Sequence, residues 1–145
     1  MTQEEKQLLL KDLCGRLLYD VIVEATYKDE EGWKTEDRKF KGLYDDGQVY
    51  VDAVYTNIEN VKPYLRSISS ITEEEKKELF EAIDKDMNLL EETLDKEPLF
   101  TYHNNRYMGN PIHYELDFLI SHHFDFRGLI PKGLALEAPE GMYKN

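Results

Sequence analysis

The segment 122–143 most constrains how this chain can fold, because it is apolar but has no regular period of its own. It reads HHFDFRGLIPKGLALEAPEGMY and contains three glycines and two prolines. It is too apolar for a disordered tail, and the glycines and prolines divide it into pieces too short for a long helix. Such pieces are stable only when packed on other elements. The side chains expected to dock on a folded core are Leu129, Ile130, Leu134 and Leu136.

The length and composition fit one domain with a hydrophobic core. The chain has 145 residues, of which 41% are hydrophobic and 12% aromatic. The one cysteine, Cys14, excludes an intramolecular disulfide framework and a cysteine-based zinc site. The first residues lack the basic region of a signal peptide, and no apolar run reaches the ~18–20 residues needed to cross a bilayer. We therefore expect a cytoplasmic protein that does not bind membranes.

Negative charge is concentrated in one part of the chain. The net charge is −12, and residues 72–97 carry −7 of it, from 11 acidic and 4 basic side chains. Nucleic acids and anionic lipids bind basic surfaces, so direct binding to either is disfavoured. The same charge would attract a basic protein partner.

The first half of the sequence predicts a short helix followed by a β-meander. Thr2 and Glu5 form a capping box that opens a helix over residues 3–14. The period of the apolar residues then changes to two, which is typical of strands with one buried face. The predicted strands are 17–27, 33–44 and 48–55, separated by turns at 29–32 and 45–47. Pro63 makes residues 58–68 a short turn or edge segment.

The second half predicts two helices. Thr72 and Glu75 form another capping box, which opens a long helix over residues 73–96. The apolar stripe of this helix consists of Leu79, Phe80, Ile83, Met87, Leu90 and Leu94. Asn110-Pro111 has the cap pattern of a third helix that runs to about His122.

These elements together predict a single α+β domain spanning residues 1–145. Residues 1–71 would form a helix and an antiparallel meander of three to four strands, one form of which is an SH3-like half-barrel. Residues 72–145 would add the other two of the three helices and the docked carboxyl-terminal segment.

The candidate metal ligands are His113, Asp117, His122, His123 and Asp125. His113 and Asp117 are four residues apart on one helix face, a spacing that can hold a metal ion. The two adjacent histidines fall on other faces, so a site would require the chain to fold back with Asp125. Alternatively, His122 and His123 satisfy free carbonyls in the last helical turn. The sequence contains no glycine-rich phosphate loop and no nucleophile elbow, so it indicates no cofactor and argues against an enzyme.

Two surfaces are candidates for protein binding. One is the acidic face of helix 73–96, including Glu74, Glu78 and Glu81, and the other is a polar loop with Tyr102 and Tyr107. Tyrosine gives a large contact area at low entropic cost, which suits recognition. The acidic face is alternatively a solvated surface that keeps the protein soluble, or an imitation of a phosphate backbone.

Three runs of sequence resemble a group of uncharacterised small proteins of gut anaerobic bacteria and their phages or mobile elements. The runs are HHFD at 122–125, RGLI at 127–130 and KGLALEAPEGMY at 132–143. Residues 8–17 and 62–76 are also similar to that group. Phe126 stands where the group would have Tyr, and Ser67 and Ile68 where it would have Pro and Met. The resemblance implies a phage or mobile-element setting and no catalytic residue.

The leading functional hypothesis is therefore a non-enzymatic, protein-binding accessory module. One alternative is an acidic decoy that occupies a nucleic-acid-binding protein. Another is a small metal-dependent enzyme that uses the cluster of His113, Asp117, His122 and His123.

Overall fold

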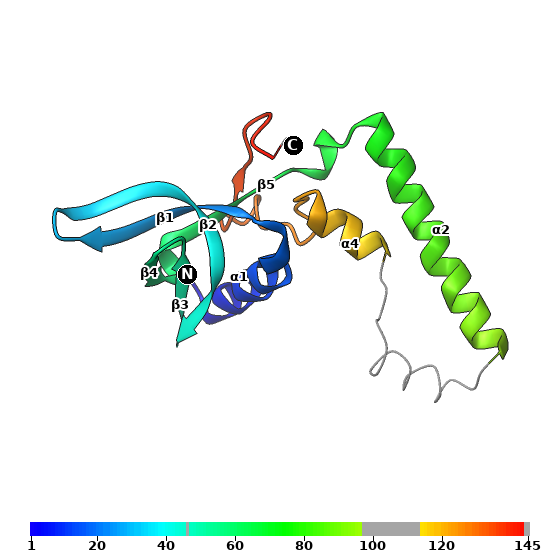
Figure 1. Ribbon diagram of the computed structural model, residues 1–145, viewed down its shortest axis with the longest axis horizontal. Coiled ribbons are helices and arrows are strands. Elements are labelled where there is room, and N and C mark those ends of the chain that lie inside the picture. Colours follow the sequence, from blue (N-terminus) through cyan, green and yellow to red (C-terminus); the bar gives the residue numbers. More distant parts are fainter. Residues whose placement is uncertain (46, 97–113, 144–145) are drawn as a thin grey trace. The chain divides into compact units, whose positions relative to one another are not determined.

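The computed structural model describes residues 1–45, 47–96 and 114–143, and the chain divides into two compact units. The first unit combines residues 1–70 with the segment from Ile120 onward, and the second consists of residues 71–119. The described residues contain three α-helices and a six-stranded, mostly antiparallel sheet (Figure 1). The predicted α+β class is confirmed, with more strands than the three to four expected.

The first helix, α1 (Gln3–Gly15), begins as the capping box predicts. The hydroxyl of Thr2 accepts a hydrogen bond of 3.1 Å from the backbone N–H of Glu5. This bond satisfies one of the helix's first amides, which have no partner within the helix. Leu9 and Leu13, one turn apart, are fully buried in the core of the first unit.

The sheet belongs to the first unit and has the strand order β4-β3-β2-β1-β5-β6. Its strands are β1 (Ile22–Asp29), β2 (Gly32–Asp45), β3 (Gln48–Val51), β4 (Val54–Asn57), β5 (Val61–Leu65) and β6 (Leu136–Glu137). All neighbours are antiparallel except β5 and β6, which run parallel.

The alternation that predicts the first strand is confirmed from Val21 onward. Val21, Val23 and Ala25 are fully buried, and Tyr27 is 6% exposed. The start of the predicted strand is wrong, because Leu17–Tyr19 form a 3-10 turn, η1. Asp20, which follows it, has the left-handed φ of 53° and reverses the chain before β1 begins.

Strand β2 bends and takes part in both halves of the sheet. Its pairing with β3 shifts register between Phe40 and Gly42, where Gly42 has a φ of +148° that only glycine adopts without strain. Strand β4, at the end of the sheet, also contacts β1: the hydroxyl of Thr56 in β4 donates a 2.7 Å hydrogen bond to the carbonyl of Thr26 in β1. The sheet therefore curls, so that β4 contacts β1 although two strands lie between them in the strand order.

Two predicted segments of the meander are corrected. Residues 48–55 are not one strand but the hairpin of β3 and β4, because Asp52 and Ala53 form a turn with φ angles of 36° and 76°. Residues 58–68 are not an edge segment but contain the 3-10 turn η2 (Ile58–Asn60) and the inner strand β5. Pro63 is tolerated there because pairing with β6 begins only at Tyr64, so the missing N–H of the proline leaves no gap in that ladder.

The carboxyl-terminal segment docks on the core of the first unit, as predicted. Leu129 is fully buried and Leu134 is 4% exposed, and both belong to the core cluster of the sheet and α1. Ile130 packs against that cluster, and Leu136 lies half-buried in β6.

The second unit contains α2 (Glu73–Lys96) and most of α4 (Tyr114–Ser121). Thr72 and Glu75 form the predicted capping box, with reciprocal hydrogen bonds of 3.1 and 3.0 Å. The predicted start of the last helix, Asn110-Pro111, lies outside the described residues. None of the helices in the described part of the chain has the length and apolar character of a membrane span.

Candidate functional site

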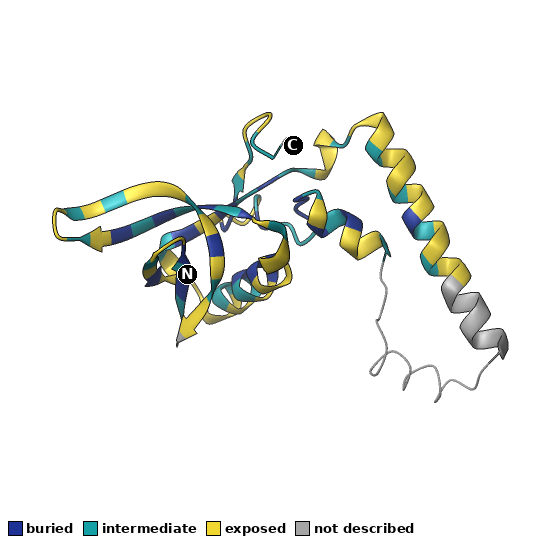
Figure 2. Ribbon diagram, in the orientation of Figure 1, coloured by how far each residue is buried: buried dark blue, intermediate teal, exposed yellow. Residues whose placement is uncertain are grey.

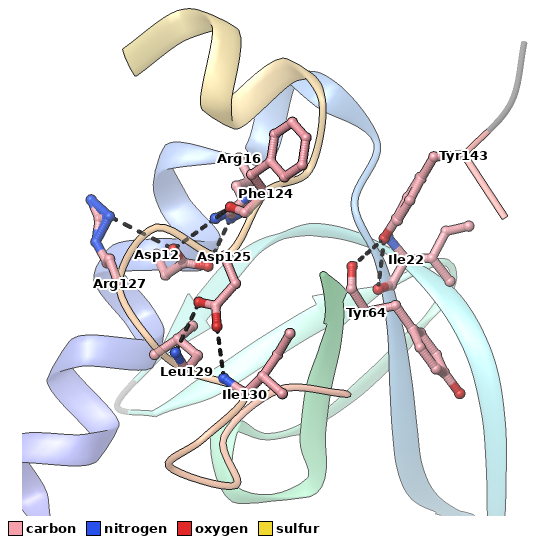
Figure 3. Close-up of polar contacts among 10 residues, drawn as sticks. All are labelled: Asp12, Arg16, Ile22, Tyr64, Phe124, Asp125, Arg127, Leu129, Ile130 and Tyr143. Carbon is pink, nitrogen blue, oxygen red and sulfur yellow. Dashed lines mark hydrogen bonds and ion pairs between the residues drawn. The ribbon is translucent and has the colours of Figure 1, made fainter. Parts of the chain in front are cut away.

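A buried ion pair joins α1 to the carboxyl-terminal segment (Figure 3). Asp12 and Arg16 are one helical turn apart, and both side chains are fully buried. Arg16 donates to the two carboxylate oxygens of Asp12 at 2.8 and 3.2 Å, and its Nη2 also donates to the carbonyl of Phe124 at 2.6 Å. Because a buried charge is costly unless it is paired and hydrogen-bonded, these contacts hold the two segments in one arrangement.

The carboxylate of Asp125 organises the turn that follows it. Its Oδ1 accepts a hydrogen bond of 2.8 Å from the N–H of Leu129, and its Oδ2 accepts one of 2.9 Å from the N–H of Ile130 (Figure 3). The backbone N–H of Asp125 donates to the carbonyl of Arg66 at 2.8 Å. Both oxygens of this buried carboxylate therefore accept hydrogen bonds from the backbone of the docked segment.

Two aromatic rings of the same segment lie against arginine side chains. The guanidinium of Arg66 is 4.3 Å from the centre of the Phe124 ring. Those of Arg16 and Arg127 are 5.2 and 4.5 Å from the centre of the Phe126 ring. Arg127 also places its Nη1 3.7 Å from Oδ1 of Asp12, which is an ion pair but too long for a hydrogen bond. Each cation–π contact contributes about 0.5–2 kcal/mol, so this group of residues strengthens the docking.

His123 and Tyr143 form a second contact point of the carboxyl-terminal segment. Their rings are stacked, with centroids 3.6 Å apart and planes 15° from parallel. The hydroxyl of Tyr143 donates a 2.6 Å hydrogen bond to the carbonyl of Tyr64 and accepts one of 3.0 Å from the N–H of Ile22 (Figure 3). The end of the segment is thereby tied to both β5 and the start of β1.

Burial changes the pKa values of His123 and Tyr143 so that each ring stays neutral. Burial, together with the positive charges of Arg16 and other nearby bases, lowers the pKa of His123 to about 4. Burial also raises the pKa of Tyr143 to about 12. Both rings are therefore uncharged at neutral pH, which suits a stack inside the protein.

The structure does not gather the predicted metal ligands that it describes. Among the described residues, no three His, Cys, Asp or Glu side chains are placed to share an ion. His123 is stacked on Tyr143, Asp125 binds backbone amides, and Asp117 is exposed on α4 in the second unit. His122 stacks on Phe124 with ring centroids 6.4 Å apart. His113 lies outside the described residues.

Three of the five residues predicted to bind a protein lie in the described part of the second unit. Glu74, Glu78 and Glu81 are exposed on α2, as a binding face requires. Tyr102 and Tyr107 lie outside the described residues.

The apolar stripe of α2 is less covered than predicted. Phe80 is 62% exposed and Met87 is 53% exposed, although both belong to the stripe expected to face a core. Leu79 and Ile83 are half-buried, and the side chains of Leu90 and Leu94 lie outside the described residues. Part of the stripe is therefore open to solvent (Figure 2).

Sequence reasoning missed an exposed tyrosine cluster in the first unit. The rings of Tyr44 and Tyr50 both contact the ring of Tyr55, at centroid distances of 4.6 and 4.9 Å. If residues 48–55 were one strand, Tyr55 would share the buried face of Val49. The turn at residues 52–53 instead places Tyr55 opposite Tyr50. In the sequence, the one residue of this run that favours a turn is Asp52.

Comparisons with known proteins add no assignment to this geometry. No protein-family profile matches the chain, and neither a curated protein nor a solved structure matches it significantly.

Proposed function

We propose that this chain is a non-enzymatic protein-binding module that acts in the cytoplasm as an accessory factor of a phage or mobile element. The observation that carries the binding role is the exposed apolar pair Phe80 and Met87 on α2, a helix that also presents the carboxylates Glu74, Glu78 and Glu81. The resemblance of the carboxyl-terminal segment supports the setting.

The exposed pair lies on a different side of α2 from the face that meets α4. Asp86 accepts hydrogen bonds from the first described amides of α4, and Ala82 is 8% exposed, so these two residues mark the covered face. Phe80 is about 200° from Ala82 around the helix axis, whereas Met87 is two turns beyond Phe80 on nearly the same side. Among the described residues of the second unit, packing therefore leaves the apolar pair exposed.

The charge of the helix specifies what kind of partner fits. Residues 72–97 carry a net charge of −7, and Glu81 and Asp84 lie close to Phe80 in the sequence. A protein segment with an apolar stripe bordered by lysine or arginine would bury Phe80 and Met87 while its charges face the carboxylates. Central aromatic contacts usually dominate such interfaces, so Phe80 should contribute more than the surrounding charges.

The test is affinity capture with the full chain from its native cytoplasm, quantified by mass spectrometry. We expect a dominant, stoichiometric partner that is lost with Phe80→Ser/Met87→Ser and retained with Trp33→Ser, a control that removes an exposed aromatic from the first unit. Equal capture of this partner by the unaltered chain, Phe80→Ser/Met87→Ser and Trp33→Ser would overturn the proposal.

Raising the salt concentration separates this function from an acidic decoy. Binding through Phe80 and Met87 should persist at about 0.5 M salt, where exposed charges are screened beyond a few ångströms. If Glu74→Lys/Glu78→Lys/Glu81→Lys abolishes capture, Phe80→Ser/Met87→Ser does not, and salt releases the partner, the decoy function replaces the one proposed.

A further inference from the structure

The hairpin of β1 and β2 has one edge without a partner strand in the described part of the chain. The two strands pair with each other out to Asp29 and Gly32 at the turn, and the hairpin extends beyond the other strands (Figure 1). On its outer side, β2 pairs with β3 only from Phe40 onward. The outer edge of residues 33–39 is therefore unpaired among the described residues.

The alternation of the ladder shows which backbone groups face this edge. The N–H of Phe40 donates to the carbonyl of Val21, so the backbone groups of Phe40 point toward the β1 side. Successive residues of a strand direct these groups to opposite edges, so those of Trp33, Thr35 and Asp37 point outward. The side chains of these three residues are exposed as well. Unpaired N–H and C=O groups at strand spacing are a template for another strand.

We propose that this edge pairs antiparallel with the same edge of a second copy of the chain, with Thr35 opposite Thr35 on the two-fold axis. Trp33 of one copy then lies opposite Asp37 of the other, and each of these facing pairs can exchange two backbone hydrogen bonds. Because the contact uses the same residues on both copies, it closes as a dimer and does not extend into a fibre.

The charges along the edge select this register. It places Lys34 of each copy opposite Glu36 of the other, and opposite charges in facing positions stabilise a ladder. Sliding the strands by two residues puts Glu36 opposite Glu36 in one direction and Lys34 opposite Lys34 in the other. Like charges directly opposite each other are destabilising, so the neighbouring registers are disfavoured.

Both side chains are free enough to reach across the new ladder. Lys34 is 37% exposed and Glu36 is 45% exposed. Within one chain they form ion pairs with Asp29 and Arg38. Such exposed pairs contribute little to stability, so rearranging them costs little.

The edge is locally neutral in a strongly acidic chain, which favours a second copy as the partner. Residues 31–39 contain three acidic and three basic side chains, whereas the whole chain has a net charge of −12. Two copies can therefore approach along this edge with little repulsion. Trp33, which is 65% exposed in the single chain, would have Thr35 and Lys39 of the other copy as diagonal neighbours.

The experiment is sedimentation equilibrium of the full chain up to about 0.5 mM, because contacts of this size are weak. We expect a reversible dimer with a Kd below about 1 mM. Thr35→Pro should weaken it about tenfold or more, because proline removes the outward N–H and no hydrogen bond to β1. Thr35→Val is the matched control, since both substitutions remove the hydroxyl that contacts Thr26 but valine keeps the N–H. Its Kd should stay within about threefold of the parent value.

Charge reversal tests the register without changing the backbone. Lys34→Glu places carboxylates opposite each other and should weaken the dimer about threefold or more, whereas Lys34→Glu/Glu36→Lys exchanges the charges and should restore it. Lys11→Glu changes the net charge by the same amount at an exposed position of α1, and it should leave the Kd within about twofold of the parent value.

Oxidative cross-linking locates the two-fold axis. Cys14→Ser removes the exposed native thiol from the background. In that background Thr35→Cys should form a disulfide-linked dimer, because facing residues have Cα atoms about 5.5 Å apart. Asp37→Cys should not, because its two copies would lie four residues apart along the ladder, or about 14 Å.

Three results would overturn the inference. They are a monomer at the highest concentration, an equal Kd for Thr35→Pro and Thr35→Val, or cross-linking through Asp37→Cys that matches or exceeds that through Thr35→Cys. If Thr35→Pro does not fold, the charge reversals and the cross-links decide, and a dimer unchanged by Lys34→Glu then counts against the edge. The edge lies in the first unit and Phe80 in the second, so this inference and the proposed function succeed or fail independently.

Discussion

The hydroxyl of Tyr143 donates a hydrogen bond of 2.6 Å to the backbone carbonyl of Tyr64, a residue 79 positions earlier in the chain. The same oxygen accepts a hydrogen bond from the N–H of Ile22 at the start of β1. One phenol oxygen thus joins three segments that are remote in sequence, and it satisfies two backbone groups that the sheet itself leaves without partners at that point.

Removing this oxygen should therefore cost more than an ordinary surface change. Tyr143→Phe keeps the stack on His123 but leaves the N–H of Ile22 and the carbonyl of Tyr64 unpaired, so we expect a loss of about 1–3 kcal/mol in the free energy of unfolding. Urea denaturation measures it. Tyr55→Phe, whose ring is 55% exposed, is the matched control and should lie within about 0.5 kcal/mol of the parent. A Tyr143→Phe protein as stable as this control would show that water replaces the lost bonds.

The buried pair of Asp12 and Arg16 should be the most sensitive polar contact of the first unit. Arg16→Met leaves the Asp12 carboxylate buried without its main partner, which typically costs about 3–5 kcal/mol. Asp12→Leu/Arg16→Met should recover part of that loss, because no uncompensated charge remains. Lys6→Met removes the half-exposed ion pair with Glu59 and should cost no more than about 1 kcal/mol. Equal losses for the Arg16 and Lys6 variants would contradict this ranking.

The lowered pKa of His123 predicts a loss of stability in weak acid. An unfolded histidine binds its proton near pH 6.5, whereas His123 in the folded protein binds one only near pH 4. Between these values the unfolded state binds more protons, so stability falls as the pH is lowered from about 6.5 to about 4 and is fully retained above that range. The loss should reach roughly 3 kcal/mol.

The charged groups around His123 act in opposite directions on this titration. Arg16, His122 and Arg66 disfavour its proton, and Asp20 favours it. His123→Asn is the matched variant, because asparagine tolerates the φ of 64° and does not titrate. Chemical denaturation at several pH values should show a smaller acid loss in this variant than in the parent. Parallel curves for the two proteins would mean that other groups cause the acid sensitivity.

Local signals in the sequence predicted helix starts and buried faces well. The capping box of Thr72 and Glu75 formed both of its hydrogen bonds, and Thr2 accepted the bond from the N–H of Glu5, because each of these contacts needs only residues three positions apart. The buried face of β1 followed from the alternation of Val21, Val23 and Ala25. The predicted metal ligands and the acidic face, by contrast, were chosen for residue type, which does not fix what each side chain contacts.

The division of residues 48–55 into two strands was missed for a reason that can be tested. A two-residue hairpin turn of this kind favours asparagine and glycine, but here Asp52 and Ala53 occupy it. Ala53 has a φ of 76°, which is strained for a residue with a Cβ atom. Ala53→Gly should therefore stabilise the protein by about 0.5–1 kcal/mol in thermal or urea unfolding, whereas Ala25→Gly in β1 should destabilise it. A destabilised Ala53→Gly protein would argue against the left-handed turn.

A contact between distant residues that sequence patterns cannot reveal is the cap of α4 by Asp86. Its two carboxylate oxygens accept hydrogen bonds of 2.8 and 2.9 Å from the N–H groups of Tyr114 and Glu115. Caps are normally sought in the residue just before a helix, and this one comes from α2, 28 residues earlier in the chain. Asp86→Ala should expose both amides and weaken the unit by about 1 kcal/mol. Asp84→Ala removes an exposed carboxylate of the same helix and is the matched control. Hydrogen exchange at Tyr114 and Glu115 should accelerate with the first substitution alone, and equal exchange in both proteins would show that Asp86 does not hold the start of α4.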